Sequence, residues 1–146
     1  MNRRFTALIP LLTAAAALAV APTVSDDEVS ARKNALELAG AYSNDGFKLR
    51  DGHWSGPIKP GEGKVVQVNL YAGNEYFFAV ASTEKAKKMA ITAYDETGTQ
   101  LEITDPYQDG AKAAIGFSPL ASGPYYVKVE EVEGEPTAYC LVCSYK

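Results

Sequence analysis

The residues that most often carry out catalysis or bind metals are scarce in this sequence. Its 146 residues include a single histidine, His53, and two cysteines, Cys140 and Cys143. A zinc site needs more ligands than these three residues supply. A nucleophile motif of the type G-x-S-x-G is absent, so His53 has no evident partner for acid–base chemistry even though Asp51 could orient it. We therefore expect His53 to be a loop or edge-strand residue, and we predict no catalytic residues, no metal and no cofactor.

Basic residues are also fewer than acidic residues. The sequence holds 14 Lys and Arg against 18 Asp and Glu, which gives a formal net charge of −4 and a pI near 5.0. Proteins that bind nucleic acid usually carry a basic patch or stripe. The nearest feature here is the group Lys85, Lys87 and Lys88, which is typical of a solvated loop. The composition therefore argues against a nucleic-acid partner.

The acidic residues show no regular series of calcium ligands. Four of them fall in expected turns, namely Asp95, Glu96, Asp105 and Asp109, but no D-x-D-x-D-G pattern is present. Aspartate in a turn usually accepts hydrogen bonds from nearby backbone amides. We expect that role here instead of metal binding.

A long hydrophobic run occurs only at the beginning of the chain. The segment 5–20 is apolar and rich in alanine, and a short basic stretch precedes it. It is shorter than the roughly 20 residues that a spanning helix needs, so it predicts a secretory signal peptide over residues 1–25. Cleavage could follow Ala19, Ala21 or Ser25, and no cysteine follows that would anchor a lipoprotein. We expect an exported bacterial protein, periplasmic or secreted, without a membrane span once the signal is removed.

A short helix is expected after the signal. Ser25 can cap its first turn, which is acidic, and apolar residues then recur at helical spacing. These residues are Ala31, Ala35, Leu38, Ala39 and Tyr42. We predict a helix over about 28–39 within an N-terminal helix-and-linker region, 26–46. An isolated helix of this length is marginal in water, so its apolar stripe should cover a sheet.

From residue 47 onward the pattern is that of short strands separated by turns. The segment 65–81 holds two β-prone runs joined by Ala72-Gly73-Asn74, and we expect it to form a central hairpin. Its outward Phe77 should be covered by the helix through Ala35, Leu38 and Tyr42. Further strands are expected over 47–49, 53–58, 89–94, 101–103, 113–117, 125–129 and 139–145. The prediction is an all-β protein, an antiparallel, jelly-roll-like β-sandwich of about eight strands over 47–146.

The two cysteines lie three residues apart in the last expected strand. Three strand residues span about 10 Å, whereas bridged cysteines have Cα atoms about 4.4–6.8 Å apart. Their side chains should also lie on opposite faces of the sheet. We therefore expect two separate thiols, with Cys143 in the core and Cys140 on the other face, and an intermolecular bridge as the alternative.

Four turn-and-strand motifs resemble the bacterial pre-peptidase C-terminal domain family. The likeness runs from about Trp54 to Lys146 and rests on Ala72-Gly73 before an aromatic strand, Met89-x-Ile91-x-Ala93-Tyr94-Asp95-x-x-Gly98, Ala121-Ser122-Gly123-x-Tyr125-x-Val127-x-Val129 and Tyr139-x-Leu141. The resemblance implies a jelly-roll-like sandwich in an exported protein. Domains of that family usually accompany a secreted peptidase, whereas this chain shows no peptidase and has its own N-terminal helix, so a function does not transfer.

Aromatic residues are the feature most suggestive of binding. The chain has nine Tyr, five Phe and one Trp, and several are expected in loops or on outer faces, where aromatic rings stack on sugars or dock partners. The candidate ligand-binding residues are Tyr71, Tyr107, Tyr94 and Trp54, with Tyr71 and Tyr107 expected at loop tips. The resulting hypothesis is a non-enzymatic exported module that binds a glycan, a peptide or a partner protein. The alternatives are a cell-envelope protein that docks through its N-terminal helix, and a hydrolase whose site the pattern does not reveal.

Overall fold

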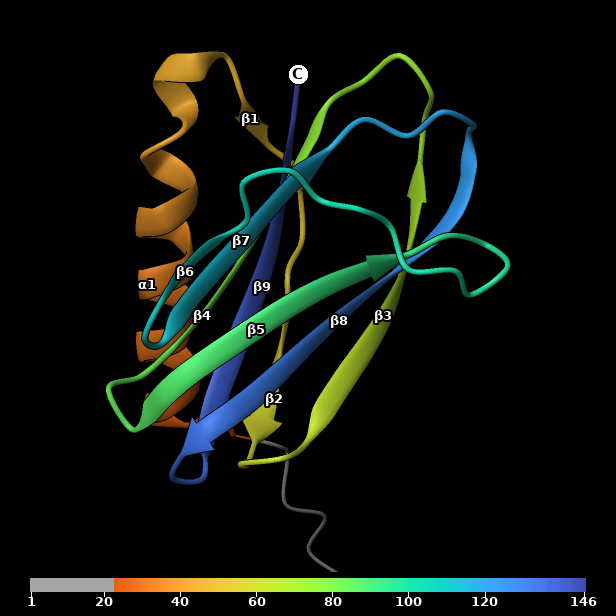
Figure 1. Cartoon of the computed structure of the whole chain (residues 1–146). Coiled ribbons are helices and arrows are strands. Elements are labelled where there is room, and N and C mark those ends of the chain that lie inside the picture. Colours follow the sequence, from red (N-terminus) through yellow and green to blue (C-terminus); the bar gives the residue numbers. More distant parts are fainter. Residues whose placement is uncertain (1–22) are drawn as a thin grey trace, which may run out of the picture.

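The computed structural model describes residues 23–146, which form a two-sheet β-sandwich with one α-helix packed on its outside (Figure 1). The predicted signal peptide lies almost entirely outside the described residues. No described helix is long and apolar enough to cross a membrane. Along the chain the elements are α1 (Asp26–Gly40), the 3-10 turn η1 (Ser43–Asp45), β1 (Lys48–Leu49), β2 (Trp54–Ile58), β3 (Gly63–Leu70), β4 (Tyr76–Ser82), β5 (Ala86–Tyr94), β6 (Tyr107–Asp109), β7 (Lys112–Phe117), β8 (Gly123–Gly134) and β9 (Thr137–Tyr145).

The strands form two antiparallel sheets of unequal size. The larger sheet has the order β1-β9-β4-β7-β6, and β2 also pairs with β9. The smaller sheet has the order β3-β8-β5. The all-β sandwich predicted from the sequence is thereby confirmed, with nine strands where about eight were expected.

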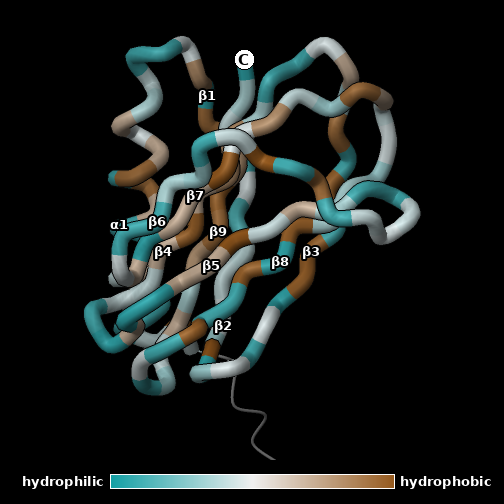
Figure 2. The backbone as a smooth tube through the Cα atoms, viewed as in Figure 1, coloured by the Kyte–Doolittle hydropathy of each residue, from teal (hydrophilic) through white to brown (hydrophobic). Residues whose placement is uncertain are grey.

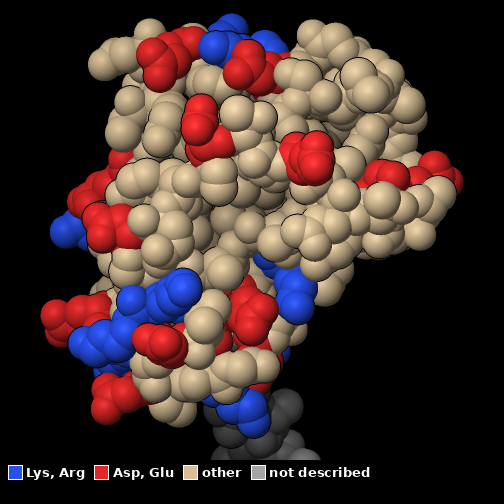
Figure 3. Space-filling model, viewed as in Figure 1, with Lys and Arg blue, Asp and Glu red and all other residues tan. Residues whose placement is uncertain are grey.

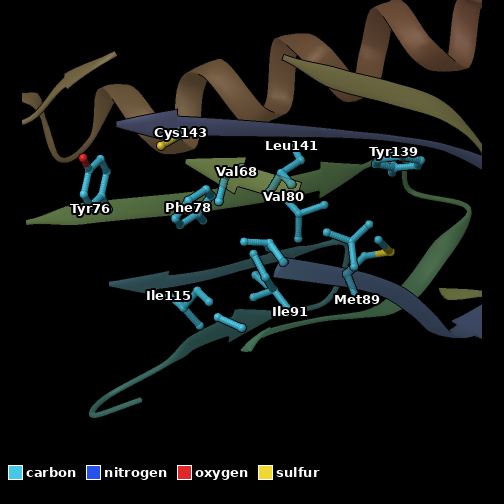
Figure 4. Close-up of a cluster of buried hydrophobic side chains, with 14 of the residues drawn as sticks. Val68, Tyr76, Phe78, Val80, Met89, Ile91, Ile115, Tyr139, Leu141 and Cys143 are labelled. Atoms are coloured by element: carbon cyan, nitrogen blue, oxygen red, sulfur yellow. The ribbon is translucent and has the colours of Figure 1, made fainter. Parts of the chain in front are cut away.

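The main core lies between the two sheets (Figure 4). It is made by the alternate residues of each strand that point inward, because successive strand side chains point to opposite faces. From β4 and β9 come Phe78, Val80 and Leu141, and from β5 and β8 come Met89, Ile91, Val127 and Val129. The tube in Figure 2 shows the same arrangement, with hydrophobic segments along the strands and hydrophilic segments at most turns.

A second apolar layer lies between α1 and the outer face of the larger sheet. Ala31, Ala35 and Leu38 are buried there against Phe77 and Ala79. The small side chains of Ala31 and Ala35 let the helix lie close to the strands. Tyr42 follows the helix and contacts Phe77, with the ring centroids 4.1 Å apart. The helix therefore covers Phe77 as expected. The apolar face of α1 is buried against the sandwich of its own chain.

The prediction that residues 65–81 form a hairpin is wrong. β3 pairs with β8 in the smaller sheet, whereas β4 pairs with β7 and β9 in the larger sheet. The connection at 71–75 therefore crosses from one sheet to the other, and Gly73 in it has a φ of 94°. Alternation correctly placed the inward faces of both strands, but it does not specify the partner of a strand.

A second difference concerns the segment between β5 and β7. The expected strand at 101–103 is irregular, although Leu101 and Ile103 pack against the core and the Leu101 amide donates to the Ala93 carbonyl at 2.9 Å. The strand in this region is β6, whose sequence Tyr-Gln-Asp has no apolar alternation. It forms because residues 107–109 pair with β7.

The cysteines occupy the two apolar layers as predicted. Cys143 lies in the main core and Cys140 lies under α1, and both are free thiols. Burial raises the pKa of each thiol to about 11.

Candidate binding surface at the loop end of the sandwich

Three connections meet at one end of the sandwich, which we call the loop end. They are the β3–β4 loop (71–75), the β5–β6 loop (95–106) and the β7–β8 loop (118–122). In Figure 1 the β3–β4 and β7–β8 loops lie toward the top and upper right, and the β5–β6 loop begins at the right and then crosses the view to β6. Loops placed by a rigid scaffold are common sites of recognition, which makes this end the natural place to look for function.

The β7–β8 loop presents an apolar side chain to solvent. Leu120 is 99% exposed, while the preceding Pro119 is buried and fixes the loop on the sandwich. The loop appears as a hydrophobic segment in Figure 2. Beside it lies a cleft of about 420 Å³, lined by Leu101, Phe117 and Leu120 and by the carboxylates of Asp95, Glu96 and Glu102. The site thus combines an apolar protrusion with an adjacent apolar cleft that has an acidic rim.

Tyr71 belongs to the same surface. Its side chain is 61% exposed, and its backbone amide donates to the Tyr76 hydroxyl at 2.9 Å. The next amide, of Ala72, donates to Ser122 Oγ at 2.9 Å, which ties the β3–β4 loop to the β7–β8 loop. This hydrogen bond holds the loops that carry Tyr71 and Leu120 next to each other, although they are far apart in sequence.

Local hydrogen bonds hold these loops in shape. Asp95 Oδ1 accepts from the amides of Thr97 and Thr99 at 2.9 and 3.0 Å and from the Thr97 hydroxyl at 2.7 Å. Hydrogen bonds from Thr97, and then from Thr99, lower the pKa of Asp95 because they favour the charged form. The Tyr125 hydroxyl donates to the Ala121 carbonyl at 2.8 Å. Asp95 thus stabilises its turn as predicted, and the surface is largely preformed.

The four candidate aromatic residues from the sequence lie in different places. Only Tyr71 lies at the loop end. Trp54 is half-buried on β2 against the main core, and Tyr94 ends β5 on the outer face of the smaller sheet, opposite Tyr126. Tyr107, expected at a loop tip, instead begins β6 and is half-buried beside the helix-covered face. Leu120 was not predicted, although an isolated leucine in a turn between Pro119 and Pro124 is a recognisable signal.

The loop end has the features of a binding surface and lacks those of a catalytic or metal site. Within residues 23–146 no group of three or more His, Cys, Asp or Glu is placed to hold a metal ion. His53 is exposed just before β2. Figure 3 shows acidic groups scattered over much of this face, with basic groups at its top edge and a mixture of acidic and basic groups at its lower end.

Comparison with known proteins identifies neighbours by fold. No family model matches the sequence, and no curated protein matches it. Among solved structures, the chain is similar to PliG of Aeromonas hydrophila, a periplasmic inhibitor of g-type lysozyme. That match has a TM-score of 0.50 and 16% identity, and it covers 65% of this chain and 85% of that chain.

The chain is likewise similar to the pre-peptidase C-terminal domain of a collagenase from Bacillus anthracis. The TM-score is 0.50 at 18% identity, over 63% of this chain and 87% of that chain. The resemblance indicated by the sequence motifs is thus confirmed as a likeness of fold.

Proposed function

We propose that this protein is an exported, non-enzymatic module that binds a partner protein through the loop end of its sandwich. The observation that carries the proposal is the exposed Leu120, held by buried Pro119 beside an apolar cleft and joined to Tyr71 through Ser122. Single exposed leucines are ordinary, but exposed apolar groups that cluster on ordered loops mark sites of protein association.

Two further observations support a protein ligand over a glycan. Sugar sites usually use an aromatic ring as a flat platform, whereas the loop end has an aliphatic protrusion as its most exposed apolar group. One fold neighbour is itself an inhibitor that acts on a protein, a g-type lysozyme. Export is supported by the N-terminal pattern and by the periplasmic location of that neighbour.

The alternative of docking through α1 is less well supported. The helix buries Ala31, Ala35 and Leu38 against its own sheet. On its outer side Val29 is 59% exposed and Leu36 is 38% exposed, which leaves a narrow apolar strip. A partner that used this strip would gain little buried area.

A g-type lysozyme is the first partner to test. We expect protein expressed from the full sequence to bind such an enzyme in calorimetry and to slow its hydrolysis of cell walls. Tyr71→Ala and Leu120→Ser should each weaken the binding by about tenfold or more, because a few central side chains dominate protein interfaces.

The matched control is Val65→Ser, which removes an apolar group about as exposed as Tyr71, 60% against 61%, from β3 outside the loop-end loops. It should leave binding unchanged. Lysozyme binding that survives the Tyr71→Ala, Leu120→Ser double variant would disprove the loop end as the binding surface. If no lysozyme binds, the same five proteins can be compared on peptide and glycan arrays, and glycan binding that depends on Tyr71 would contradict a protein ligand.

A further inference from the structure

A second concave site lies on the helix-covered face, between the end of α1 and the β6–β7 edge of the larger sheet. It is a groove of about 500 Å³. Phe77 on β4, Tyr42 and Phe47 after the end of α1, and Tyr107 on β6 all line it. We call it the aromatic groove.

The aromatic rings of this groove are packed but not fully covered. The ring centroids of Tyr42 and Phe77 lie 4.1 Å apart, and those of Phe47 and Phe77 lie 5.8 Å apart. Phe77 is buried, whereas Tyr42, Phe47 and Tyr107 are half-buried. Desolvation, with smaller effects from Asp109 and Tyr42, raises the pKa of the Tyr107 phenol, so it stays neutral near pH 7. The groove thus presents neutral aromatic surface to a ligand.

Gly116 keeps the groove open. It lies directly opposite Phe77 in the β4–β7 pair and is exposed. A Cβ at this position would be 3.8 Å from the Phe77 ring and 3.6 Å from the Tyr76 carbonyl, which are ordinary contact distances. A larger residue would therefore fit the strand but would occupy the space above Phe77.

The charges around the groove favour a cation. Asp45, Glu75 and Asp105 line it, and Lys146 is the one basic residue among its lining residues. Lys146 already acts as an internal cation. Its ammonium lies 4.5 Å from the centroid of the Phe47 ring, lies 3.5 Å from Glu75 Oε2 and donates to the Asp45 carbonyl at 3.1 Å. The groove therefore holds one cation on an aromatic face and retains an excess of negative charge.

We propose that the aromatic groove binds the side chain of an arginine presented by a partner protein. A guanidinium is planar and weakly hydrated, so it stacks on aromatic rings and pairs with carboxylates better than an ammonium does. The half-buried rings supply the stacking surface, and Asp105 and Glu75 supply the charge. This site borders the loop-end cleft at Phe117 and Ser118, but Tyr42, Phe77 and Tyr107 line only the groove. The inference does not depend on the function proposed for the loop end.

The direct test compares two short acetylated peptides that differ at one residue. One carries arginine between glycine and serine residues, and the other carries citrulline, which keeps the shape and removes the charge. We expect the arginine peptide to bind about tenfold more tightly in NMR titrations of the whole protein, because a partly desolvated cation on an aromatic face contributes on that order. The shifts should centre on Phe77, Tyr107 and Gly116.

Single-residue variants test the contribution of the groove's space and of its charges separately. Gly116→Leu should fill the groove and abolish arginine binding while the melting temperature stays within a few degrees of the wild type. Asp105→Asn should weaken binding several-fold, and because Asp105 has a φ of 54°, a conformation that asparagine also tolerates, the loop should keep its shape. Lys146→Gln should strengthen binding several-fold by freeing the Phe47 face, whereas Lys88→Gln, with the same charge change at an exposed site outside the groove, should not.

Several results would overturn the inference. They are equal binding of the arginine and citrulline peptides, absence of arginine binding at millimolar peptide, or undiminished binding by Gly116→Leu. Tighter binding of a neutral sugar than of the arginine peptide would assign the groove to a different ligand class. Loss of the loop-end function, tested separately with Tyr71→Ala, would leave these outcomes unaffected.

Discussion

At the scale of single residues, Glu131 stands out among residues 23–146 as a buried carboxylate without a partner. It lies on β8 opposite Met89, is fully buried, and has no hydrogen-bond partner for either carboxylate oxygen among residues 23–146. Desolvation raises the pKa of this carboxyl because burial disfavours its charged form. The folded state therefore binds more protons than the unfolded state between the ordinary pKa and the raised one, and the free energy of unfolding falls as pH rises through that window.

Replacing Glu131 should accordingly stabilise the protein. We expect Glu131→Met to raise the free energy of unfolding near pH 7 by about 1–3 kcal/mol, because burying an unpaired polar group costs about that much. The gain should shrink as the pH falls toward 4. Urea titrations across this range measure it, with Glu133→Met, at an exposed position on the same strand, as the control. A destabilised Glu131→Met variant near pH 7 would show that the carboxylate has a partner.

The two thiols give a second prediction at this scale. Cys140 and Cys143 are buried in different layers, and burial raises the pKa of each to about 11. Because the thiolate is the reactive form, neither should react with a disulfide reagent near pH 8 in the folded protein, and both should react in denaturant. A thiol count shows this directly, and one that stays at zero in denaturant would reveal a disulfide.

At the scale of the elements, the start of α1 depends on a residue close to the predicted signal cleavage. Ser25 Oγ accepts the Glu28 amide at 3.2 Å and caps the helix. We expect Ser25→Ala to cost about 1 kcal/mol of stability, measured by thermal unfolding, whereas Ser30→Ala, inside the helix, should cost less. Cleavage after Ser25 would remove this cap, so cleavage after Ala19 or Ala21 should give the more stable product. Equal losses from the two serine variants would contradict the capping role.

The helix and strands also show which parts of the fold could be predicted from the sequence. The period-two pattern correctly assigned inward Val68 and Phe78, and the helical spacing correctly assigned the face of α1 that covers Phe77. The period-two pattern did not identify the partner of β3, because alternation and a Gly-Asn turn are compatible both with a hairpin and with a connection that crosses between sheets. It also missed β6, whose strand conformation comes from pairing with β7 and not from its own residues.

At the scale of the whole molecule, both proposed binding surfaces are made of residues that are distant in sequence and that the fold brings together. The loop end joins residues of three loops, and the aromatic groove joins residues from η1 and its flanks, β4, β6 and β7. Among the candidates chosen from the sequence, Tyr71 lies on one surface and Tyr107 on the other. The exposure of Leu120 could have been suspected from its place between two prolines, but the cleft beside it could not. Gly116 could not be foreseen either, because the role of a strand glycine depends on the side chains around it.

The central position of β9 has a consequence for how the chain acquires its structure. This strand, near the end of the sequence, pairs with β1, β2 and β4 and lies under α1. The larger sheet therefore cannot close until residues 137–145 are available, and nearly all its pairings join segments far apart in the chain. Such a topology folds slowly. A chain whose larger sheet stays open until residues 137–145 emerge remains unfolded for longer, which is compatible with the export that we propose.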